Sequence, residues 1–331
     1  MDKVFKYELF NKMIRDFAVN EVKPLAHEVD EQERFPYETV EKMAKLGLMG
    51  IIVPKEYGGM GGDYKMYIKA VEELSKVCAT TGVILSAHTS LCIAPIMEYG
   101  NEEQKKKYLP KLASGEWLGA FGLTEPNAGT DANNQTTTAV KEGDHWVLNG
   151  SKIFITNAGP ANVYFVIAVT GRNPKGVECA AFIVEKGFPG FSVGKKELKM
   201  GIRGSSTCEL IFENCIVPEA NLVGKIGEGV KMALKTLDGG RVGISAQALG
   251  IAEGALEATV AYVKERKQFN KPISAFQNTQ FCLADLYTKI NAASLLVERA
   301  TEAKQNKSPM LGMYAAQAKL FAAETAMEVT T

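Results

Sequence analysis

Phe121–Asp131 reads FGLTEPNAGTD and lies where a helical sequence gives way to a β-rich one. A charged amphipathic run over Glu102–Leu112 precedes it, and alternating, strand-like segments follow it. Pro126, Asn127 and Gly129 stand close together, so we expect a tight loop rather than a regular element. Such loops expose N–H groups and hydroxyls that can bind a phosphate or the polar edge of a planar cofactor, although most of them are only turns.

The composition is typical of a globular enzyme-sized protein. With 331 residues, two or three domains are expected, and 46% hydrophobic and 23% charged residues are ordinary values. Lys plus Arg and Asp plus Glu are 38 each, which argues against nucleic acid or an anionic membrane as the main partner. The six cysteines show no metal-binding spacing, and no apolar leader is seen. We therefore expect a cytoplasmic protein with reduced cysteines and no metal site.

The first third of the chain is predicted to be helical. Apolar residues at helical spacing indicate helices over Tyr7–Val29, Pro36–Leu46, Tyr67–Val77 and Thr81–Tyr99, and the last is apolar nearly all round, as a buried helix is. The glycine-rich Val53–Asp63 lacks the GxGxxG spacing of a dinucleotide fingerprint and is interpreted as a connecting loop.

The histidines do not suggest a catalytic centre. His88 lies in the apolar helix with no matching nucleophile or metal partner in the sequence, so it is interpreted as a satisfied core histidine. His27 and His145 are no better placed. A histidine-based triad is therefore not expected.

A small β domain is predicted in the middle of the chain. Asn149–Gly150 is interpreted as a two-residue hairpin turn between Trp146–Leu148 and Lys152–Thr156. Other short strands are expected over Thr136–Val140, Tyr164–Thr170, Cys179–Val184 and Thr207–Phe212, with turn residues at Lys141–Asp144. Short strands with tight turns and no helix between them indicate a small barrel or sandwich.

The last third of the chain is predicted to be helical again. Ser274–Gln277 matches a capping box that would open a long helix, and Ser308–Pro309 would start the next one. Three helices make an incomplete bundle, and no C-capping glycine precedes Thr331, so we expect the chain to be truncated inside this domain. The predicted fold is α+β and multidomain, with a helical domain (1–118), a β domain (119–226) and an incomplete helical bundle (227–331).

Six motifs in this order resemble those of the acyl-CoA dehydrogenase flavoproteins. The resemblance extends from about Phe5 to Thr331, and the sequence around Thr80–Leu91 and Leu237–Ala248 is most similar to bacterial short-chain, butyryl-CoA-type enzymes. The six motifs are Phe121–Asp131 (a flavin loop), Lys152–Asn157 (KIFITN), Lys199–Ser205 (KMGIRGS), Leu237–Gly243 (LDGGRVG), Glu265–Phe269 (ERKQF) and Phe276–Phe281 (FQNTQF).

The resemblance implies a reaction and its partners. In the family, a carboxylate base removes the α-proton of an acyl-CoA thioester while the β-hydrogen leaves as hydride to FAD, which gives the trans-2-enoyl-CoA. The α C–H bond is weakly acidic, so such a site must polarise the thioester carbonyl and exclude water. The family's electrons pass to electron-transfer flavoprotein, and a homotetramer built from dimers, with FAD at the subunit interface, is implied.

The resemblance also implies which residues in the β domain contact FAD. The implied contacts are Phe121, Leu123 and Thr124 along the flavin ring, Thr130 at the phosphate and pantetheine side, and Phe154, Ile155 and Thr156 over the ring. The alternative is simple alternation along KIFIT, which would place Ile153 and Ile155 on the inner face and leave Phe154 and Thr156 as mere surface residues.

Further sites are implied in the C-terminal region. Arg266 resembles an arginine that reaches the FAD of a neighbouring subunit, although it could be a solvated helix charge beside Glu265. The capping box would explain Gln277 without any ligand. The implied FAD contacts here are Arg266, Phe269, Phe276 and Gln277. The implied substrate contacts are Asp238, Arg241 and Thr130. The alternative for Asp238 and Arg241 is an ion pair on the helix surface.

The departures from the family concern the base. The family's usual base is a glutamate in an IYEGT-like motif near the C-terminus, and this sequence contains neither that motif nor the HGGxGY-like segment before it. Some relatives place the base two residues after the position of Asp238, where this chain has Gly240. Glu125 matches an ordinary structural position, so no catalytic residue is assigned. Asn270 replaces the usual glycine, and asparagine tolerates a left-handed backbone better than most residues.

Two other functions remain open at this point. The chain could be a non-catalytic acyl-CoA- or flavin-binding protein, or an inert truncated product. An acyl-CoA oxidase would use the same chemistry with oxygen as the acceptor, but oxidases of this kind are typically longer chains.

Overall fold

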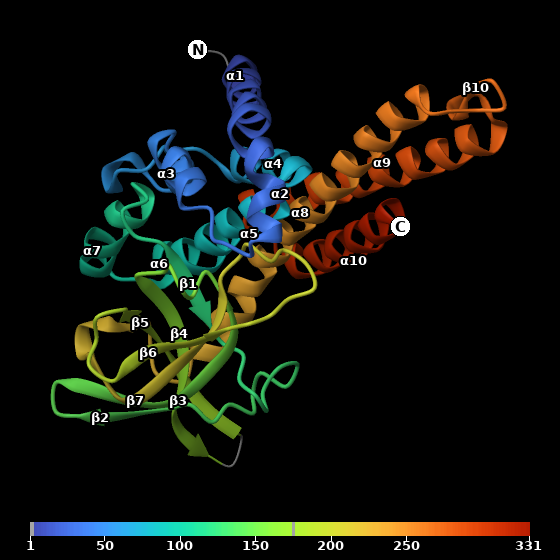
Figure 1. Ribbon diagram of the computed structural model, residues 1–331. Helices are drawn as coiled ribbons and strands as arrows, with labels where there is room; N and C mark the ends of the chain where they lie inside the picture. Colours follow the sequence, from blue (N-terminus) through green and yellow to red (C-terminus); the bar gives the residue numbers. More distant parts are fainter. Residues whose placement is uncertain (1–2, 174–175) are drawn as a thin grey trace. The chain divides into compact units, whose positions relative to one another are not determined.

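The computed structural model describes residues 3–173 and 176–331 (Figure 1). Contacts divide the chain into two units, each built from separate stretches. The first consists of Met1–His27, Asp63–Val83 and Arg241–Thr331, and the second of Glu28–Gly62 and Ile84–Gly240. The three domain ranges expected from the sequence stay a prediction.

The second unit contains a mainly antiparallel sheet of eight strands. Among the described residues the strand order is β6-β7-β3-β2-β4-β5-β8, and β1 pairs in parallel with β4. The predicted small β domain is therefore confirmed, and its strands form one sheet. The strands are β1 Gly119–Gly122, β2 Thr138–Glu142, β3 His145–Thr156, β4 Val163–Asn173, β5 Gly176–Glu185, β6 Phe191–Lys196, β7 Thr207–Pro218 and β8 Leu222–Val223.

Large aromatic side chains fill the core of this sheet. Trp146 meets Phe182 edge to face at 5.4 Å between ring centroids, and Phe191 contacts both Tyr164 and Phe212. Such pairs add stability beyond the apolar area that they bury. Around them lie small and branched residues that are also buried, among them Ala120, Leu148, Val166 and Leu210.

The helices predicted from apolar spacing are present. In the second unit α7 carries a capping box made by Asn101 and Gln104. In the first unit the ion pairs Lys65–Glu302 (3.0 Å) and Lys76–Glu253 (2.8 Å) join α4 to α9 and α8. The main helices are α1 Lys3–Phe17, α2 Lys23–Glu31, α3 Tyr37–Lys45, α4 Tyr64–Val77, α5 Ala79–Ser86, α6 Ala94–Tyr99, α7 Glu102–Ala113, α8 Gly229–Glu265, α9 Gln277–Gln305 and α10 Leu311–Thr330, with π-helical segments at Ala18–Val22 and Ala87–Ile93.

The apolar run Ala79–Tyr99 has the length and hydropathy of a membrane span, but 83% of it is buried inside the protein. Core helices of soluble proteins pass the same test, so this run is weak evidence for a membrane. Its burial agrees with the buried helix predicted from the sequence.

The predicted hairpin turn at Asn149–Gly150 is wrong. β3 runs unbroken from His145 to Thr156, and the turn lies at Gly143–Asp144, between the paired residues Glu142 and His145. Gly150 instead lies at an irregularity of the β3–β7 register, with φ of +137°. A Cβ there would lie 2.7 Å from the Cα of Thr137, so glycine is needed for close approach of the backbones.

The predicted capping box at Ser274–Gln277 is also wrong. Ile273–Ala275 forms a short 3-10 turn, and Phe276 is the N-cap residue of α9 without a side-chain cap hydrogen bond. The helix α9 therefore begins at Gln277, three residues after Ser274.

Gly150→Ala is expected to lower the free energy of unfolding by about 2–3 kcal/mol, because the new methyl meets the Thr137 backbone and the positive φ is strained. Gly143→Ala is the matched control, since Gly143 has φ of +62° but open space around it, and its cost is about 1 kcal/mol. Urea unfolding measures both variants. Equal effects of the two would contradict the close-approach explanation.

Candidate functional site

The first two residues of the predicted loop belong to a strand. Phe121 and Gly122 lie in β1, paired with Phe165 and Val166 of β4, and the Phe121 ring is buried and stacks on Phe165 at 6.2 Å. The tight loop predicted over Phe121–Asp131 therefore begins only at Leu123. The parallel pairing explains the difference, because it extends β1 to the edge of the proline- and glycine-containing segment.

A buried lysine of β3 holds both ends of this loop. The Lys152 ammonium is fully buried and donates to Leu123 O (3.2 Å), Glu125 Oε1 (2.7 Å) and Gln135 Oε1 (2.8 Å). Leu123 and Glu125 lie at the start of the loop, and Gln135 lies near its end. Lysine is almost never fully buried, so the sequence predicts no buried ammonium at position 152. The one signal in the sequence is the position of Lys152 directly before the apolar residues Ile153, Phe154 and Ile155.

The carboxylate of Glu125 completes the network. It accepts hydrogen bonds from Thr136 N (2.6 Å), Thr136 Oγ1 (2.7 Å) and Thr137 N (3.0 Å). Burial alone would raise the pKa of Glu125, but the Lys152 charge and these donors lower it to about 2. Burial lowers the pKa of Lys152 to about 8, opposed by the Glu125 charge. Both groups are therefore ionised at neutral pH.

A β-bulge at the end of β3 presents Phe154 to solvent. Lys152 pairs with Leu210 of β7 and Ile155 with Cys208, so β3 contains one extra residue between these pairs. Phe154 has a left-handed φ of +60° and its side chain is 61% exposed, whereas Ile155 is buried. Simple alternation is thus broken, because buried Lys152 and exposed Phe154 do not share a face. Bulky residues rarely adopt this backbone region, and such strain clusters at functional sites.

Three threonine hydroxyls near these segments are available to a ligand. Thr124 and Thr156 are half-buried and Thr130 is exposed, and within residues 3–173 and 176–331 their hydroxyls have no hydrogen-bond partner. An exposed aromatic ring and unpaired hydroxyls suit the apolar face and polar edge of a flavin. The residues present therefore fit the cofactor that the resemblance implies.

His88 and Asn157 both form hydrogen bonds with the backbone of Gly119, the first residue of β1. The ring of His88 is fully buried, accepts from Gly119 N at Nδ1 (3.0 Å) and donates from Nε2 to Leu112 O (3.1 Å). Burial lowers the pKa of His88 to about 4, so the ring is neutral. The prediction of a satisfied core histidine is confirmed. Asn157 donates to Ile84 O (3.1 Å), and its buried Oδ1 has no partner in the described part of the chain.

The C-terminal candidates gather on a two-stranded ribbon in the first unit. β9 Lys267–Gln268 and β10 Lys271–Pro272 pair across a turn formed by Phe269 and Asn270, which lies at the tip of the α8–α9 hairpin (Figure 1). Both turn residues have positive φ, +52° and +60°, as a type I′ turn requires. Asn270 thus adopts the left-handed backbone that its replacement of glycine suggested.

The ribbon brings Arg266, Phe269, Phe276 and Gln277 together. Phe269 is 87% exposed and meets Phe276 edge to face at 6.1 Å, and Arg266 and Gln277 are exposed at the end of α8 and the start of α9. Since Gln277 is the first residue of α9, the capping-box explanation of its role no longer applies.

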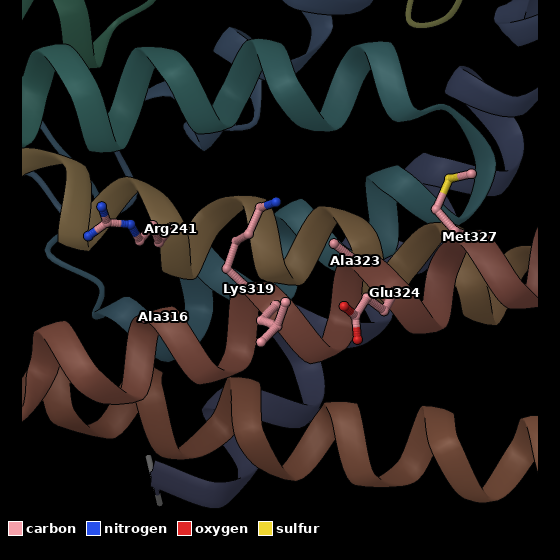
Figure 2. A pocket seen from close by; sticks show the side chains of 7 residues that line it. Arg241, Ala316, Lys319, Ala323, Glu324 and Met327 are labelled. Atoms are coloured by element: carbon pink, nitrogen blue, oxygen red, sulfur yellow. The ribbon is translucent and has the colours of Figure 1, made fainter. Parts of the chain in front are cut away.

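The substrate-side candidates lie one turn apart on α8. Asp238 is half-buried and Arg241 is exposed. Figure 2 shows Arg241 beside a groove of about 580 Å³ whose other lining residues belong to α10. These are Ala316, Lys319, Leu320, Ala323, Glu324 and Met327, so both apolar and charged side chains line the groove.

Three family models match consecutive parts of the chain. They are the N-terminal, middle and C-terminal domains of acyl-CoA dehydrogenase, over residues 6–116, 120–215 and 227–331. The chain belongs to the acyl-CoA dehydrogenase family. This confirms the resemblance, the fold class and the enzyme class, because the family comprises oxidoreductases that act on a CH–CH bond and use FAD.

Relatives of this family are similar over almost the whole chain. A short-chain specific acyl-CoA dehydrogenase of Clostridium acetobutylicum is 59% identical over 324 residues, covering 98% of this chain and 85% of the relative. The butyryl-CoA dehydrogenase of Megasphaera elsdenii has a TM-score of 0.94 at 48% identity, covering 97% and 85%. A chain in a structure of the electron transferring flavoprotein of Acidaminococcus fermentans has a TM-score of 0.94 at 53% identity, covering 97% and 84%.

Neither Glu125 nor position 240 provides an alternative catalytic base in this chain. Glu125 is committed to Lys152 and two threonines, and a carboxylate with a pKa near 2 is a weak base. Gly240 has no side chain. The interpretation of Glu125 as a structural residue is thus supported by its contacts, and the prediction that the base lies beyond Thr331 stays a prediction.

Glu125→Gln is expected to lower the free energy of unfolding by about 3–5 kcal/mol, because it leaves the Lys152 ammonium buried without an opposite charge. Adding Lys152→Met removes the stranded charge and should restore part of the loss. The control is Glu219→Gln, which breaks the exposed Lys141–Glu219 pair and should cost less than about 1 kcal/mol. Urea unfolding would refute this view of the pair if Glu125→Gln and Glu219→Gln had similar effects.

Proposed function

We propose that this chain is an FAD-dependent dehydrogenase of short-chain acyl-CoA, which converts a butyryl-CoA-like thioester to the trans-2-enoyl-CoA. The observation that carries the proposal is the bulge of β3, where an exposed Phe154 and the hydroxyl of Thr156 lie beside a loop anchored to the same strand. The short-chain relatives from Clostridium acetobutylicum and Megasphaera elsdenii support the substrate class.

FAD supplies the acceptor for the β-hydrogen when it is bound, and the residues of this chain hold and orient it. Phe121 in β1 and Leu123 directly after it contribute apolar side chains, and Phe154 and Ile155 contribute the bulge. In this proposal the hydroxyls of Thr124 and Thr156 bind the polar edge of the ring, and Thr130 binds at the phosphate and pantetheine side. Arg266 reaches the FAD of a neighbouring subunit, as the resemblance implies, and Phe269, Phe276 and Gln277 are further FAD contacts.

Substrate binding is assigned to Asp238, Arg241 and Thr130. Arg241 borders a groove that Ala316, Leu320, Ala323 and Met327 also line, and these apolar side chains suit an acyl chain whose polar end remains near a cation. Neither Glu125 nor position 240 supplies the base that removes the α-proton, since Glu125 is paired with Lys152 and position 240 is glycine.

Electron-transfer flavoprotein is the proposed acceptor of the electrons. The similarity to a chain in the structure of such a flavoprotein from Acidaminococcus fermentans supports this partner. The proposed location is the cytoplasm, which agrees with the neutral net charge and with six free cysteines, of which five are buried and Cys282 is exposed.

The visible spectrum of the purified protein tests the proposal. We expect bound FAD that dithionite bleaches but that anaerobic butyryl-CoA does not, while the same chain extended by an IYEGT-type segment is bleached by butyryl-CoA. Bleaching of the 331-residue chain by butyryl-CoA would place the base within it. A protein that binds no FAD would overturn the proposed function and favour an inert or scaffold role.

The assembly is proposed to be a homotetramer built from dimers, with the ribbon of one subunit at the FAD of another. Native mass spectrometry of the chain extended as above should therefore give four copies and four FAD. Phe269→Ser, in the exposed turn, is expected to weaken FAD retention without unfolding the subunit. A monomer that retains FAD would contradict the shared site.

A further inference from the structure

The fully buried Lys152 connects two segments that the proposed function assigns to the flavin. Its ammonium contacts both the start and the end of the loop between β1 and β2, through Leu123, Glu125 and Gln135. Its backbone belongs to the strand that ends in the Phe154 bulge. One side chain therefore fixes the loop and the bulge relative to each other.

The loop has few other attachments to the strand. Ile153 N donates to Thr124 O (2.8 Å), and Thr137 Oγ1 donates to Ser151 O (3.1 Å), so these bonds flank Lys152 on either side. Between Pro126 and Asn134 most of the loop residues are exposed, including Thr130. A loop of this kind keeps a single conformation only if its ends are fixed, because conformational entropy opposes ordering of every exposed residue.

The inward direction of Lys152 also determines where the bulge begins. In a regular strand, residues two apart share a face, and Phe154 would then point inward with Lys152. Since Glu125 and Gln135 hold the Lys152 ammonium inside, the extra residue between Lys152 and Ile155 turns Phe154 outward. The left-handed φ of Phe154 is sustained by this arrangement.

We propose that Lys152 and Glu125 are a pair of positioning residues for the flavin site. They set the distance between the loop hydroxyls of Thr124 and Thr130 and the bulge that carries Phe154 and Thr156. The inference rests on the proposed function only for the identity of the ligand. The anchoring of the loop by the pair is a property of the protein without FAD.

The pair could contribute to stability alone, so the test separates positioning from stability. The variant Glu125→Gln with Lys152→Met keeps the side-chain sizes and removes both charges. Lys141→Met is the matched control. Lys141 lies on the neighbouring strand β2, forms an exposed ion pair with Glu219 and contacts none of the segments that the proposed function assigns to the flavin. Each protein is prepared without FAD, and its unfolding midpoint is recorded first.

Two readouts then follow the site itself. Amide hydrogen exchange over residues 123–137 of the FAD-free protein reports the anchoring of the loop. Flavin fluorescence and visible circular dichroism report FAD affinity and the environment of the ring. The double variant is expected to show faster exchange in this loop, at least tenfold weaker FAD binding and an altered circular dichroism spectrum, and the control none of these.

The outcomes are distinct. If the double variant folds and its amide hydrogen exchange in the loop and its visible circular dichroism spectrum equal those of the parent protein, the positioning role is overturned, even if the parent protein binds FAD well. A parent protein that binds no FAD would overturn the proposed function, whereas the exchange readout would still test the anchoring. If the double variant does not fold, Thr136→Val replaces it, since this exposed residue loses only its hydroxyl bond to Glu125. It should weaken FAD binding roughly 2- to 10-fold, the equivalent of one typical hydrogen bond, and no change would refute the proposal.

Discussion

The burial of one ammonium and one carboxylate inside the β unit is the constraint on which the loop between β1 and β2 and the adjoining part of β3 depend. Removing two charges from water costs several kcal/mol per ion, and attraction between them offsets this only when all donors and acceptors are used. Here the ammonium of Lys152 meets three oxygens, and the carboxylate of Glu125 meets three further donors. Those partners all lie in the loop, so the loop must close over the strand for the pair to exist.

Local patterns predicted the elements well where a segment interacts mainly with its own neighbours in sequence. The helix over Tyr67–Val77 and the buried run over Thr81–Tyr99 follow from apolar spacing alone, and both are present. Asn149–Gly150 was misread because the dipeptide favours a turn in isolation, whereas pairing with β2 and β7 on both sides keeps β3 extended. A strand with two partners overrides a local turn preference.

The site was only partly predictable for the same reason. Motif resemblance predicts that Phe154 and Thr156 contact the flavin, and period-two alternation also predicts an exposed Phe154, but alternation gives no reason for Lys152, two residues earlier, to be buried. The bulge that reconciles them depends on Leu210 and Cys208 of β7, which lie far along the chain. Asn270 was predictable because its backbone preference is intrinsic to the residue. Lys152 was not, because its partners arise only from tertiary structure.

Packing also determines where the chemistry of proton removal can be placed. Gly240 faces Leu91 of the π-helical segment so closely that a Cβ at position 240 would lie 2.8 Å from Leu91 Cδ2. A carboxylate at this position, as some family members have, would require Leu91 to move and a larger volume beside it. Leu91 Cδ2 is the end of a flexible side chain, so this adjustment is smaller than a shift of backbone would be. Position 240 supplies no base in this chain because glycine has no side chain, and Leu91 occupies the space that a side chain there would enter.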